Sequence, residues 1–140
     1  MTTDKKIIGF TGITADLLHP GHLAHLEEAH RYCDWLIVGI NVNPCDREYK
    51  NKPVESVFER CMRVRACKWA DEIICYDGEK DLELLTAVLP FDIKFIGSDY
   101  YGKDFTGKKI CEERGIEIHY CDRYHDLSTT NLRKRLENNA

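Results

Sequence analysis

The sequence contains no apolar run long enough to cross a membrane. A spanning helix needs about 20 apolar residues, whereas the clearest apolar stretch here covers only residues 35–41. The N-terminal segment MTTDKK is mostly polar and leads into a strand-like segment, without the apolar core of a secretory signal. We therefore expect a cytoplasmic protein with no membrane partner.

The sequence also lacks an excess of basic residues. It has 20 Lys and Arg against 24 Asp and Glu, which gives a formal net charge of -4 at pH 7. A nucleic-acid-binding domain is usually basic overall or carries a basic stripe, so we expect no nucleic-acid partner. A small anionic substrate remains compatible with this charge, because a few positive groups and backbone N–H groups can converge on it locally.

No two of the seven cysteines stand in the CxxC spacing that marks many zinc and redox sites. Most of them have apolar neighbours, as small buried thiols in a reducing compartment usually do. These are Cys33, Cys61, Cys67, Cys75 and Cys111. We therefore predict structural cysteines and no metal site.

Strand-like and helix-like segments alternate along all 140 residues, which we interpret as one domain covering residues 1–140. The predicted strands are residues 6–11, 35–41, 72–75, 93–96 and 116–120, and the predicted helices are residues 19–32, 55–69, 81–89, 110–114 and 128–136. This alternation predicts an α/β fold, a Rossmann-like parallel sheet with helices on both faces. Ligands bind beyond the carboxyl ends of the strands in such sheets.

Two histidines stand at the start of the first predicted helix, in the segment His19-Pro20-Gly21-His22. At a spacing of three residues they share one face of the helix. Proline suits the first helical position, and Gly21 lets a ligand approach the backbone closely. The start of a helix offers N–H groups and the positive end of the dipole, so we predict a phosphate site here. The alternative is a helix start with two surface histidines.

Lys68 is a second candidate, because the predicted helix over residues 55–69 places it on one face with Val57, Cys61 and Val64. A buried lysine is unfavourable unless it has a partner or a function. We therefore expect Lys68 to have an anionic partner, which a bound phosphate would supply. The alternative is that it snorkels from the end of the helix into solvent.

Three further polar residues follow predicted strands or open the last helix. Asp99 follows an apolar strand and a glycine, so it lies at the carboxyl end of that strand. Ser128 and Thr129 open the last helix, where hydroxyl groups cap N–H groups and can also contact a phosphate. The alternative to a role in the site is turn formation for Asp99 and simple helix capping for Ser128 and Thr129.

Three segments together resemble a known enzyme family. Asp16 to His22, DLLHPGH, resembles the HxGH signature of nucleotidyltransferases that cleave nucleoside triphosphates between the α and β phosphates. Gly97 to Tyr100 resembles their GDD-type turn, and the segment from Arg123 to Thr130 resembles the RTxGxSTT signature of the cytidylyltransferase branch. The order of the segments, over nearly the whole chain, is most similar to the small glycerol-3-phosphate cytidylyltransferases.

This resemblance implies transfer of CMP from CTP, with Mg²⁺, to a small phosphorylated acceptor, by default glycerol 3-phosphate, and release of pyrophosphate. It also implies a homodimer. The catalytic residues implied are His19, His22, Lys68 and Arg123. The residues implied to bind the nucleotide are Thr14, Ala15, Asp16, Gly21, Lys50, Lys52, Arg60, Asp99, Ser128 and Thr129. A solvated surface loop is the alternative for Lys50 and Lys52.

The sequence departs from the family pattern at three positions. The family usually reads GxFDxxHxGH, where this chain has Ile13 and Ala15, with the glycine displaced to Gly12. Asp126 replaces the glycine of the second signature. These changes concern the shape of the pocket and leave the acceptor open. An ATP-using adenylyltransferase of a sugar or polyol phosphate, and an inactive nucleotide-binding module, are the alternative functions; Arg123 favours CTP.

Overall fold

The computed structural model describes residues 5–44, 52–122 and 129–139, and the side chains of all of these except residues 129–133. Four predicted site residues are affected by these limits. Lys50, Arg123 and Ser128 lie outside the described residues, and so does the side chain of Thr129.

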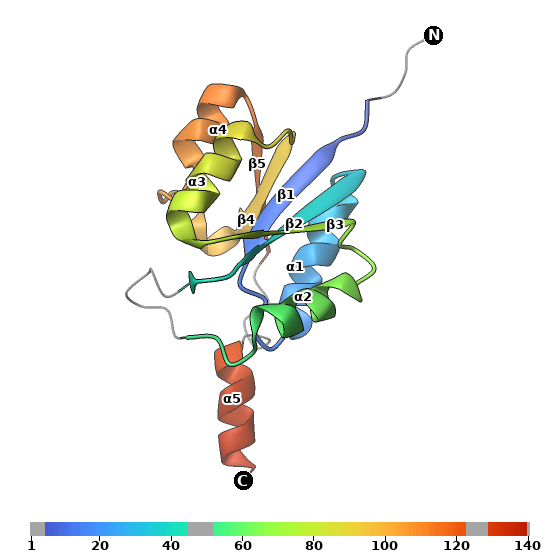
Figure 1. The fold of residues 1–140 in the computed structure, drawn as a ribbon, viewed down its shortest axis with the longest axis vertical. Helices are drawn as coiled ribbons and strands as arrows, with labels where there is room; N and C mark the ends of the chain where they lie inside the picture. The colour runs from blue at the N-terminus through green and yellow to red at the C-terminus, as the bar shows by residue number, and fades with distance from the viewer. Residues whose placement is uncertain (1–4, 45–51, 123–128, 140) are drawn as a thin grey trace.

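Five parallel strands form one sheet, which confirms the predicted fold class (Figure 1). In the order across the sheet they are β3 (Glu72–Tyr76), β2 (Trp35–Asn41), β1 (Ile8–Ile13), β4 (Ile93–Gly97) and β5 (Glu117–Cys121). The chain moves outward from β1 in one direction through β2 and β3, and then returns to place β4 on the other side of β1. Ligands bind at the point of this reversal in doubly wound sheets.

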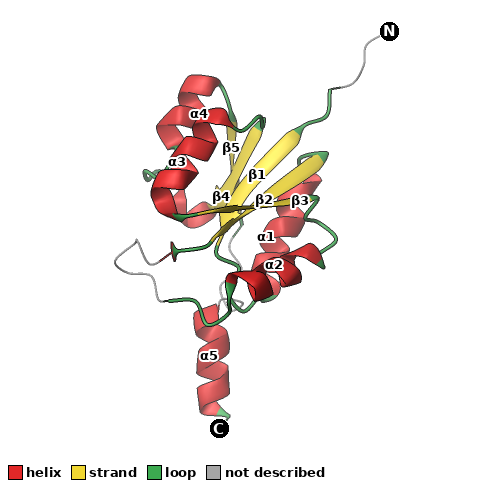
Figure 2. Ribbon diagram, viewed as in Figure 1, coloured by secondary structure: helices red, strands yellow, loops and turns green. Residues whose placement is uncertain are grey.

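Helices cover both faces of the sheet (Figure 2). The helices are α1 (Pro20–Arg31), α2 (Val57–Arg65), α3 (Gly78–Val88), α4 (Lys108–Arg114) and α5 (Thr129–Asn138). One buried cluster joins Leu26 of α1 and Val64 of α2 to the sheet, and a second joins Leu82 of α3 and Cys111 of α4 to the opposite face. Among the described residues, no helix combines the length and apolar character that a membrane span requires.

The sheet opens between β1 and β4 toward the carboxyl ends of the strands. β1 pairs with β2 as far as Ile13 and Ile40, but β1 and β4 pair only through Gly9 with Ile93 and Phe10 with Lys94. Beyond that last pair the two strands follow different partners, β1 with β2 and β4 with β5. This separation places a cleft at the reversal point of the sheet.

The predicted helix over residues 55–69 is wrong at its C-terminal end. α2 ends at Arg65 and its C-cap is Ala66. The following residues turn back toward the sheet, where Cys67 and Trp69 pack against the core cluster of α1 and α2. Packing of this segment therefore ends the helix four residues before the predicted end, and helical periodicity does not extend to Lys68.

Candidate active site

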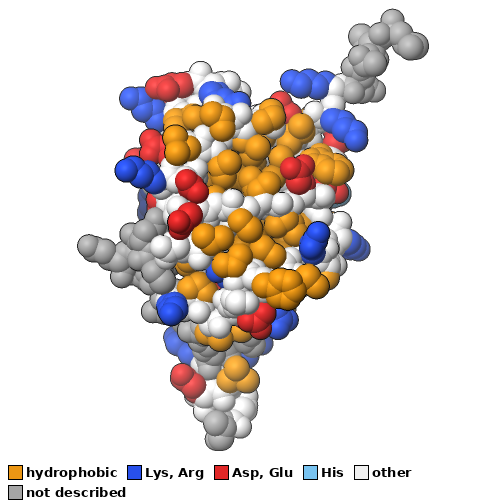
Figure 3. Space-filling model, in the orientation of Figure 1, with side chains coloured by type: hydrophobic (Ala, Val, Ile, Leu, Met, Phe, Trp, Pro, Cys, Tyr) orange, Lys and Arg blue, Asp and Glu red, His pale blue; other side chains and the backbone are white. Residues whose placement is uncertain are grey.

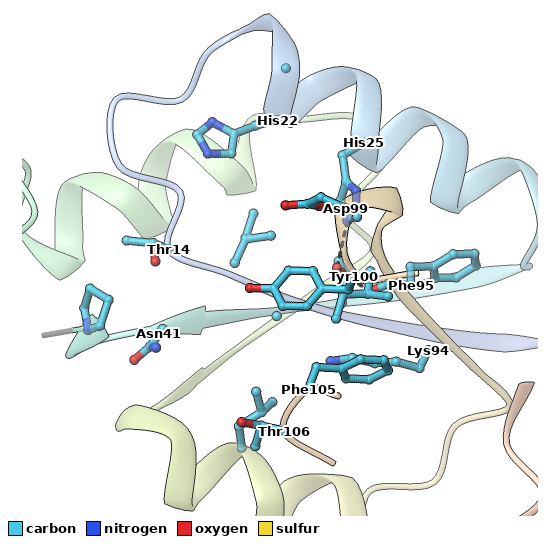
Figure 4. A pocket seen from close by; sticks show the side chains of 18 of the residues that line it. Thr14, His22, His25, Asn41, Lys94, Phe95, Asp99, Tyr100, Phe105 and Thr106 are labelled. Atoms are coloured by element: carbon cyan, nitrogen blue, oxygen red, sulfur yellow. Dashed lines mark hydrogen bonds between the residues drawn. The ribbon is translucent and has the colours of Figure 1, made fainter. Parts of the chain in front are cut away.

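A cavity of about 390 Å³ lies at the carboxyl edge of the sheet, where β1 and β4 separate (Figure 4). Its lining comes from β1, the first turns of α1, the ends of β2 and β3, α3, β4, the segment that follows β4 and Asp122 after β5. Five predicted site residues line it: Thr14, His19, Gly21, His22 and Asp99. The structure thus brings the histidine segment and the Asp99 turn to one site.

His19 and His22 cap the start of α1 with their own side chains. The backbone N–H of Gly21 donates to Nδ1 of His19 at 3.0 Å, and the backbone N–H of His19 donates to Nδ1 of His22 at 3.2 Å. Two of the N–H groups at this helix end are therefore already paired, in contrast to the expectation that they are free for a phosphate. Because each Nδ1 accepts a hydrogen bond, the proton of each neutral ring lies on Nε2.

Both histidines are uncharged at neutral pH. Burial lowers the pKa of His19, and burial together with the nearby His19 and His25 lowers the pKa of His22 to about 3. The two rings lie against each other, with their centroids 3.8 Å apart. The site therefore presents two neutral imidazoles, each with an Nε2–H donor.

The turn that precedes His19 has an unusual backbone. Ala15 and Leu17 have φ of 59° and 49°, a region that non-glycine residues rarely adopt. The Asp16 carboxylate holds this turn by accepting the N–H groups of Val54 and Glu55, each at 2.9 Å, while the Glu55 carboxylate accepts the N–H of Leu17 at 2.7 Å. Asp16 is therefore a positioning residue of the turn and does not line the cavity.

Two departures from the family pattern acquire a structural explanation. Ala15 is fully buried in the core rather than in the cavity, so its predicted contact with the nucleotide is not supported. Gly12 lines the cavity, and a Cβ on it would lie 2.7 Å from the hydroxyl oxygen of Tyr76. Gly12, beside Ile13, thus lies in close contact with the Tyr76 side chain at the edge of the cavity.

Arg60 does not line the cavity but holds the backbone that forms its edge. Its guanidinium is buried and donates to the carbonyl oxygens of Asn41 at 2.7 Å and Thr14 at 2.9 Å. These carbonyls lie at the end of β2 and just after β1. Arg60 therefore ties the ends of two strands to α2 and places a positive charge beneath the turn that carries the histidines.

Lys68 does not occupy the position predicted for it. It lies beyond the end of α2, is exposed, and places Nζ 5.0 Å from the centroid of the Trp69 ring. It precedes β3, so it lies at the amino edge of the sheet, opposite the cavity. Lys68 therefore does not lie on the buried face of a helix, which was the reason to expect a phosphate contact. The alternative, a lysine that reaches into solvent, describes it correctly. Lys52 is also exposed and does not line the cavity.

Two cavity residues were missed by the sequence analysis, His25 and Lys94. His25 Nε2 lies 2.9 Å from the Thr11 hydroxyl, and burial lowers the pKa of His25 to about 4. It follows His22 by three residues, so continuing the histidine spacing along the helix identifies it. Lys94 interrupts an apolar strand, so the argument about a lysine among apolar residues applies to Lys94 rather than to Lys68.

Glu28, His119 and Cys121 form a group of potential metal ligands, with ligand atoms within 4.8 Å of one another. No cysteine spacing in the sequence indicates this group. The Glu28 carboxylate already has partners, His119 Nε2 at 2.8 Å and the N–H of Asp122 at 3.0 Å. Burial and the neighbouring Glu28 also raise the pKa of the Cys121 thiol. We interpret the group as a hydrogen-bonded link between α1 and β5.

Two solved structures share this fold. A lipopolysaccharide core biosynthesis protein from Thermoplasma volcanium matches with a TM-score of 0.71 and 21% identity, over 86% of this chain and 99% of that chain. TmcAL of Thermotoga maritima, bound with alpha-thio ATP, matches with a TM-score of 0.64 and 14% identity, over 96% of this chain and 51% of that chain.

Comparison of sequences finds a relative with a higher identity than these two structures. The Bifunctional protein HldE of Aliarcobacter butzleri is 33% identical over 137 residues, which cover 96% of this chain and 28% of that protein. The chain thus spans just over a quarter of the length of this curated relative. The sequence model described as cytidylyltransferase-like matches residues 10–135. The histidine turn, the five-stranded sheet and this match agree: the chain belongs to the cytidylyltransferase-like family of HxGH nucleotidyltransferases.

Proposed function

We propose that this chain transfers a nucleotidyl group from a nucleoside triphosphate to the phosphate of a small acceptor. An acceptor phosphate oxygen attacks the α-phosphorus, the bond to the oxygen that bridges the α and β phosphates breaks, and pyrophosphate leaves. The observation that carries this proposal is the pair of neutral histidines at the start of α1, which line the cavity at the reversal point of the sheet.

In this proposal the protein acts by positioning and by stabilising charge, without a covalent intermediate. The Nε2–H groups of His19 and His22 donate to phosphate oxygens on which negative charge develops. Neutral donors suit this role because the capping hydrogen bonds at Nδ1 hold both rings in place before the substrate binds. Arg60 adds a buried positive charge without contacting the cavity. Arg123 and the loop with Lys50 and Lys52 are further proposed phosphate ligands by resemblance.

The cavity offers oxygen ligands suited to Mg²⁺. Glu79, Asp99 and Asp122 line it, and Mg²⁺ usually binds one or two carboxylates together with substrate phosphates. Asp99, which follows β4, is the residue we assign to this ion. When bound with the nucleotide, Mg²⁺ would neutralise part of the charge of the triphosphate.

We infer that ATP is favoured over CTP as the donor. The relative reported above is named Bifunctional protein HldE rather than a cytidylyltransferase. TmcAL of Thermotoga maritima, which shares the fold, is bound with alpha-thio ATP in its crystal structure. Asp126 departs from the CTP-type signature. Transfer of AMP to a sugar or polyol phosphate is therefore the first proposal, and transfer of CMP to glycerol 3-phosphate is the second.

An inactive nucleotide-binding module is the competing proposal from another class of protein. The changes at Ile13, Ala15 and Asp126 favour this alternative, but Ala15 is buried in the core and does not line the cavity, whereas Gly12 beside Ile13 does. The histidine pair is intact and pre-positioned. These observations favour an active enzyme.

A homodimer is part of the proposal, by resemblance and because of one apolar surface. Figure 3 shows apolar side chains gathered between α2 and α3 over β3, an edge strand. The exposed large apolar side chains of these two helices are Phe58 and Met62 of α2 and Leu84 and Val88 of α3. Light scattering measures the mass in solution. We expect a dimer that Phe58→Lys with Met62→Lys converts to a monomer, and a monomeric wild type contradicts this part.

The deciding experiment measures pyrophosphate release with ATP and CTP, each combined with glycerol 3-phosphate and a panel of sugar 1-phosphates. We expect release that depends on an acceptor and on Mg²⁺, with ATP and a sugar phosphate giving the highest kcat/KM. Greater kcat/KM with CTP would reverse the order of the two donors. Absence of release with every pair, while nucleotide binding persists, would support the inactive module.

A further inference from the structure

Lys94 lies at the inner end of the cleft between β1 and β4. It forms the last register pair that joins the two strands, opposite Phe10, and beyond this pair they separate. Its Nζ lies 4.7 Å from the centroid of the Phe10 ring, and the residue lines the cavity. Figure 4 shows the side chain reaching from β4 into the cavity, toward Phe105. Lys94 therefore forms the floor of the site.

Among the described residues, the Lys94 ammonium group has no anionic partner in direct contact. The residue is only 3% exposed, and within the described part of the chain Nζ makes no hydrogen bond or ion pair. Cys111 and Glu79 act on it through space, but burial outweighs both and lowers the pKa of Lys94 to about 8. Because a buried charge is costly without a partner, the cavity at Lys94 is suited to an anionic group of a ligand.

This position is separate from the reacting phosphate. The charge of Lys94 acts on His25, whereas the groups that act on His22 are His19, His25 and Asp16. His25 lies about 4.5 Å farther along the axis of α1 than His22, since each residue of a helix rises 1.5 Å. Lys94 Nζ lies over the Phe10 ring, which packs with α3 and α4, whereas His19 and His22 stand at the start of α1 on the other face of the sheet. We therefore take an anion at Lys94 to be a different group from the phosphate held by His19 and His22.

The surroundings of Lys94 also differ from those of the predicted nucleotide site. Phe10 and Leu82 belong to the buried cluster beneath α3 and α4, and Leu82 and Thr106 line the cavity on this side. Three of the residues that the resemblance assigns to the nucleotide line the cavity: Thr14, Gly21 and Asp99. They lie at the start of α1 and in the segments after β1 and β4. The region around Lys94 therefore remains for the acceptor.

We propose that Lys94 determines acceptor specificity by binding a second anionic group, a carboxylate or another phosphate, which the acceptor carries in addition to the phosphate that reacts. This inference rests on the proposed nucleotidyl transfer for its biological meaning. The ion pair itself needs only a ligand that bears the second anion. The substrate class is accordingly a doubly anionic small molecule rather than a simple polyol or sugar monophosphate.

The test uses two matched pairs of acceptors. Glycerol 3-phosphate and 3-phosphoglycerate differ by a carboxylate, and glucose 1-phosphate and glucose 1,6-bisphosphate differ by a phosphate. Calorimetry gives the Kd of each for the wild type, for Lys94→Met and for the control Lys80→Met, which removes an exposed lysine of α3. We expect the wild type and Lys80→Met to bind the doubly anionic member of one pair about 10-fold tighter or more. The pair that shows this preference identifies the second anion as carboxylate or phosphate.

Lys94→Met should reduce that preference to less than about twofold, with an unchanged Kd for ATP and CTP. A melting temperature at least equal to that of the wild type would show that the variant is folded. The proposal is overturned if the wild type binds both members of each pair equally or binds none of them, if Lys94→Met keeps the preference, or if it weakens nucleotide binding instead. Absence of pyrophosphate release would remove the proposed function alone, because the calorimetric comparison does not need turnover.

Discussion

At the scale of single residues, protonation determines which side chains of the cavity are charged at neutral pH. A histidine is half protonated near pH 6.5 in water, yet the pKa of His22 is about 3 and that of His25 about 4. His22 and His25 therefore carry hydrogen-bond donors and no positive charge at neutral pH. Among the described side chains that line the cavity, the buried cation is instead Lys94.

The two histidines at the start of α1 should be essential for turnover. We predict that His19→Ala and His22→Ala each lower kcat about 10²-fold or more, because each removes a donor that stabilises charge in the transition state. The measurement is steady-state pyrophosphate release, with circular dichroism to confirm folding. His30→Ala, a change of a histidine in the last turn of the same helix, serves as the control. Wild-type turnover in both folded variants would show that the site is assigned incorrectly.

The buried charge of Lys94 should lower stability in a pH-dependent manner. The folded protein releases this proton near pH 8, and an unfolded chain releases it near pH 10.4. Between these values the unfolded state binds more protons, so stability rises with pH, and below pH 8 the full penalty remains. We predict that Lys94→Met raises the free energy of unfolding at pH 7 by on the order of 2–3 kcal/mol.

The gain from Lys94→Met should shrink between pH 8 and pH 10, as measured by urea unfolding of both proteins in the absence of ligand. Lys80→Met, which changes the net charge equally, should show no such trend. A Lys94→Met variant that is less stable than the wild type at pH 7 would indicate that the ammonium has a stabilising partner.

At the scale of secondary-structure elements, the ends of α1 and α2 place the polar residues. The cap of α1 comes from the imidazoles themselves, and the turn before it is held through Asp16 by the backbone that precedes α2. α2 ends at Arg65 because the next residues pack into the core. Lys68 consequently points to solvent beside Trp69.

Because α2 ends before Lys68, we expect substitution of Lys68 to have little effect on kcat/KM. Lys68→Met should change kcat/KM by less than about twofold, because an exposed lysine at the amino edge of the sheet makes no contact with the cavity. Pyrophosphate release and the melting temperature are measured on the same preparation. A loss of 10-fold or so in kcat/KM would restore Lys68 to the site.

At the scale of the whole molecule, the sheet brings distant segments together. Glu28 of α1 meets His119 and Cys121 of β5, and the cleft between β1 and β4 joins the histidines to Lys94. The six described cysteines are free thiols. The order of the strands therefore determines both the candidate active site and the hydrogen-bonded group of Glu28, His119 and Cys121.

The cysteines should have no catalytic metal. We predict that activity survives a zinc chelator when Mg²⁺ is replenished, because the Glu28 carboxylate is satisfied by His119 and Asp122 and the Cys121 thiol remains protonated. The measurement combines metal analysis of the purified protein with pyrophosphate release before and after chelation. Stoichiometric zinc that is lost together with activity, and that Cys121→Ser prevents from binding, would contradict this prediction.

The sequence by itself determined the α/β class, the order of the elements and the histidine turn, since these depend on residues close together in the chain. Alternating apolar segments identified all five strands, and Pro20 with Gly21 between two histidines identified the start of α1. Only the tertiary structure decided which lysine is buried. Periodicity along a helix placed Lys68 in the core, but packing after α2 ended that helix early. Lys94 is buried because β1 and β4 separate just beyond it, and that separation follows from which strands pair across the sheet, which no local pattern contains.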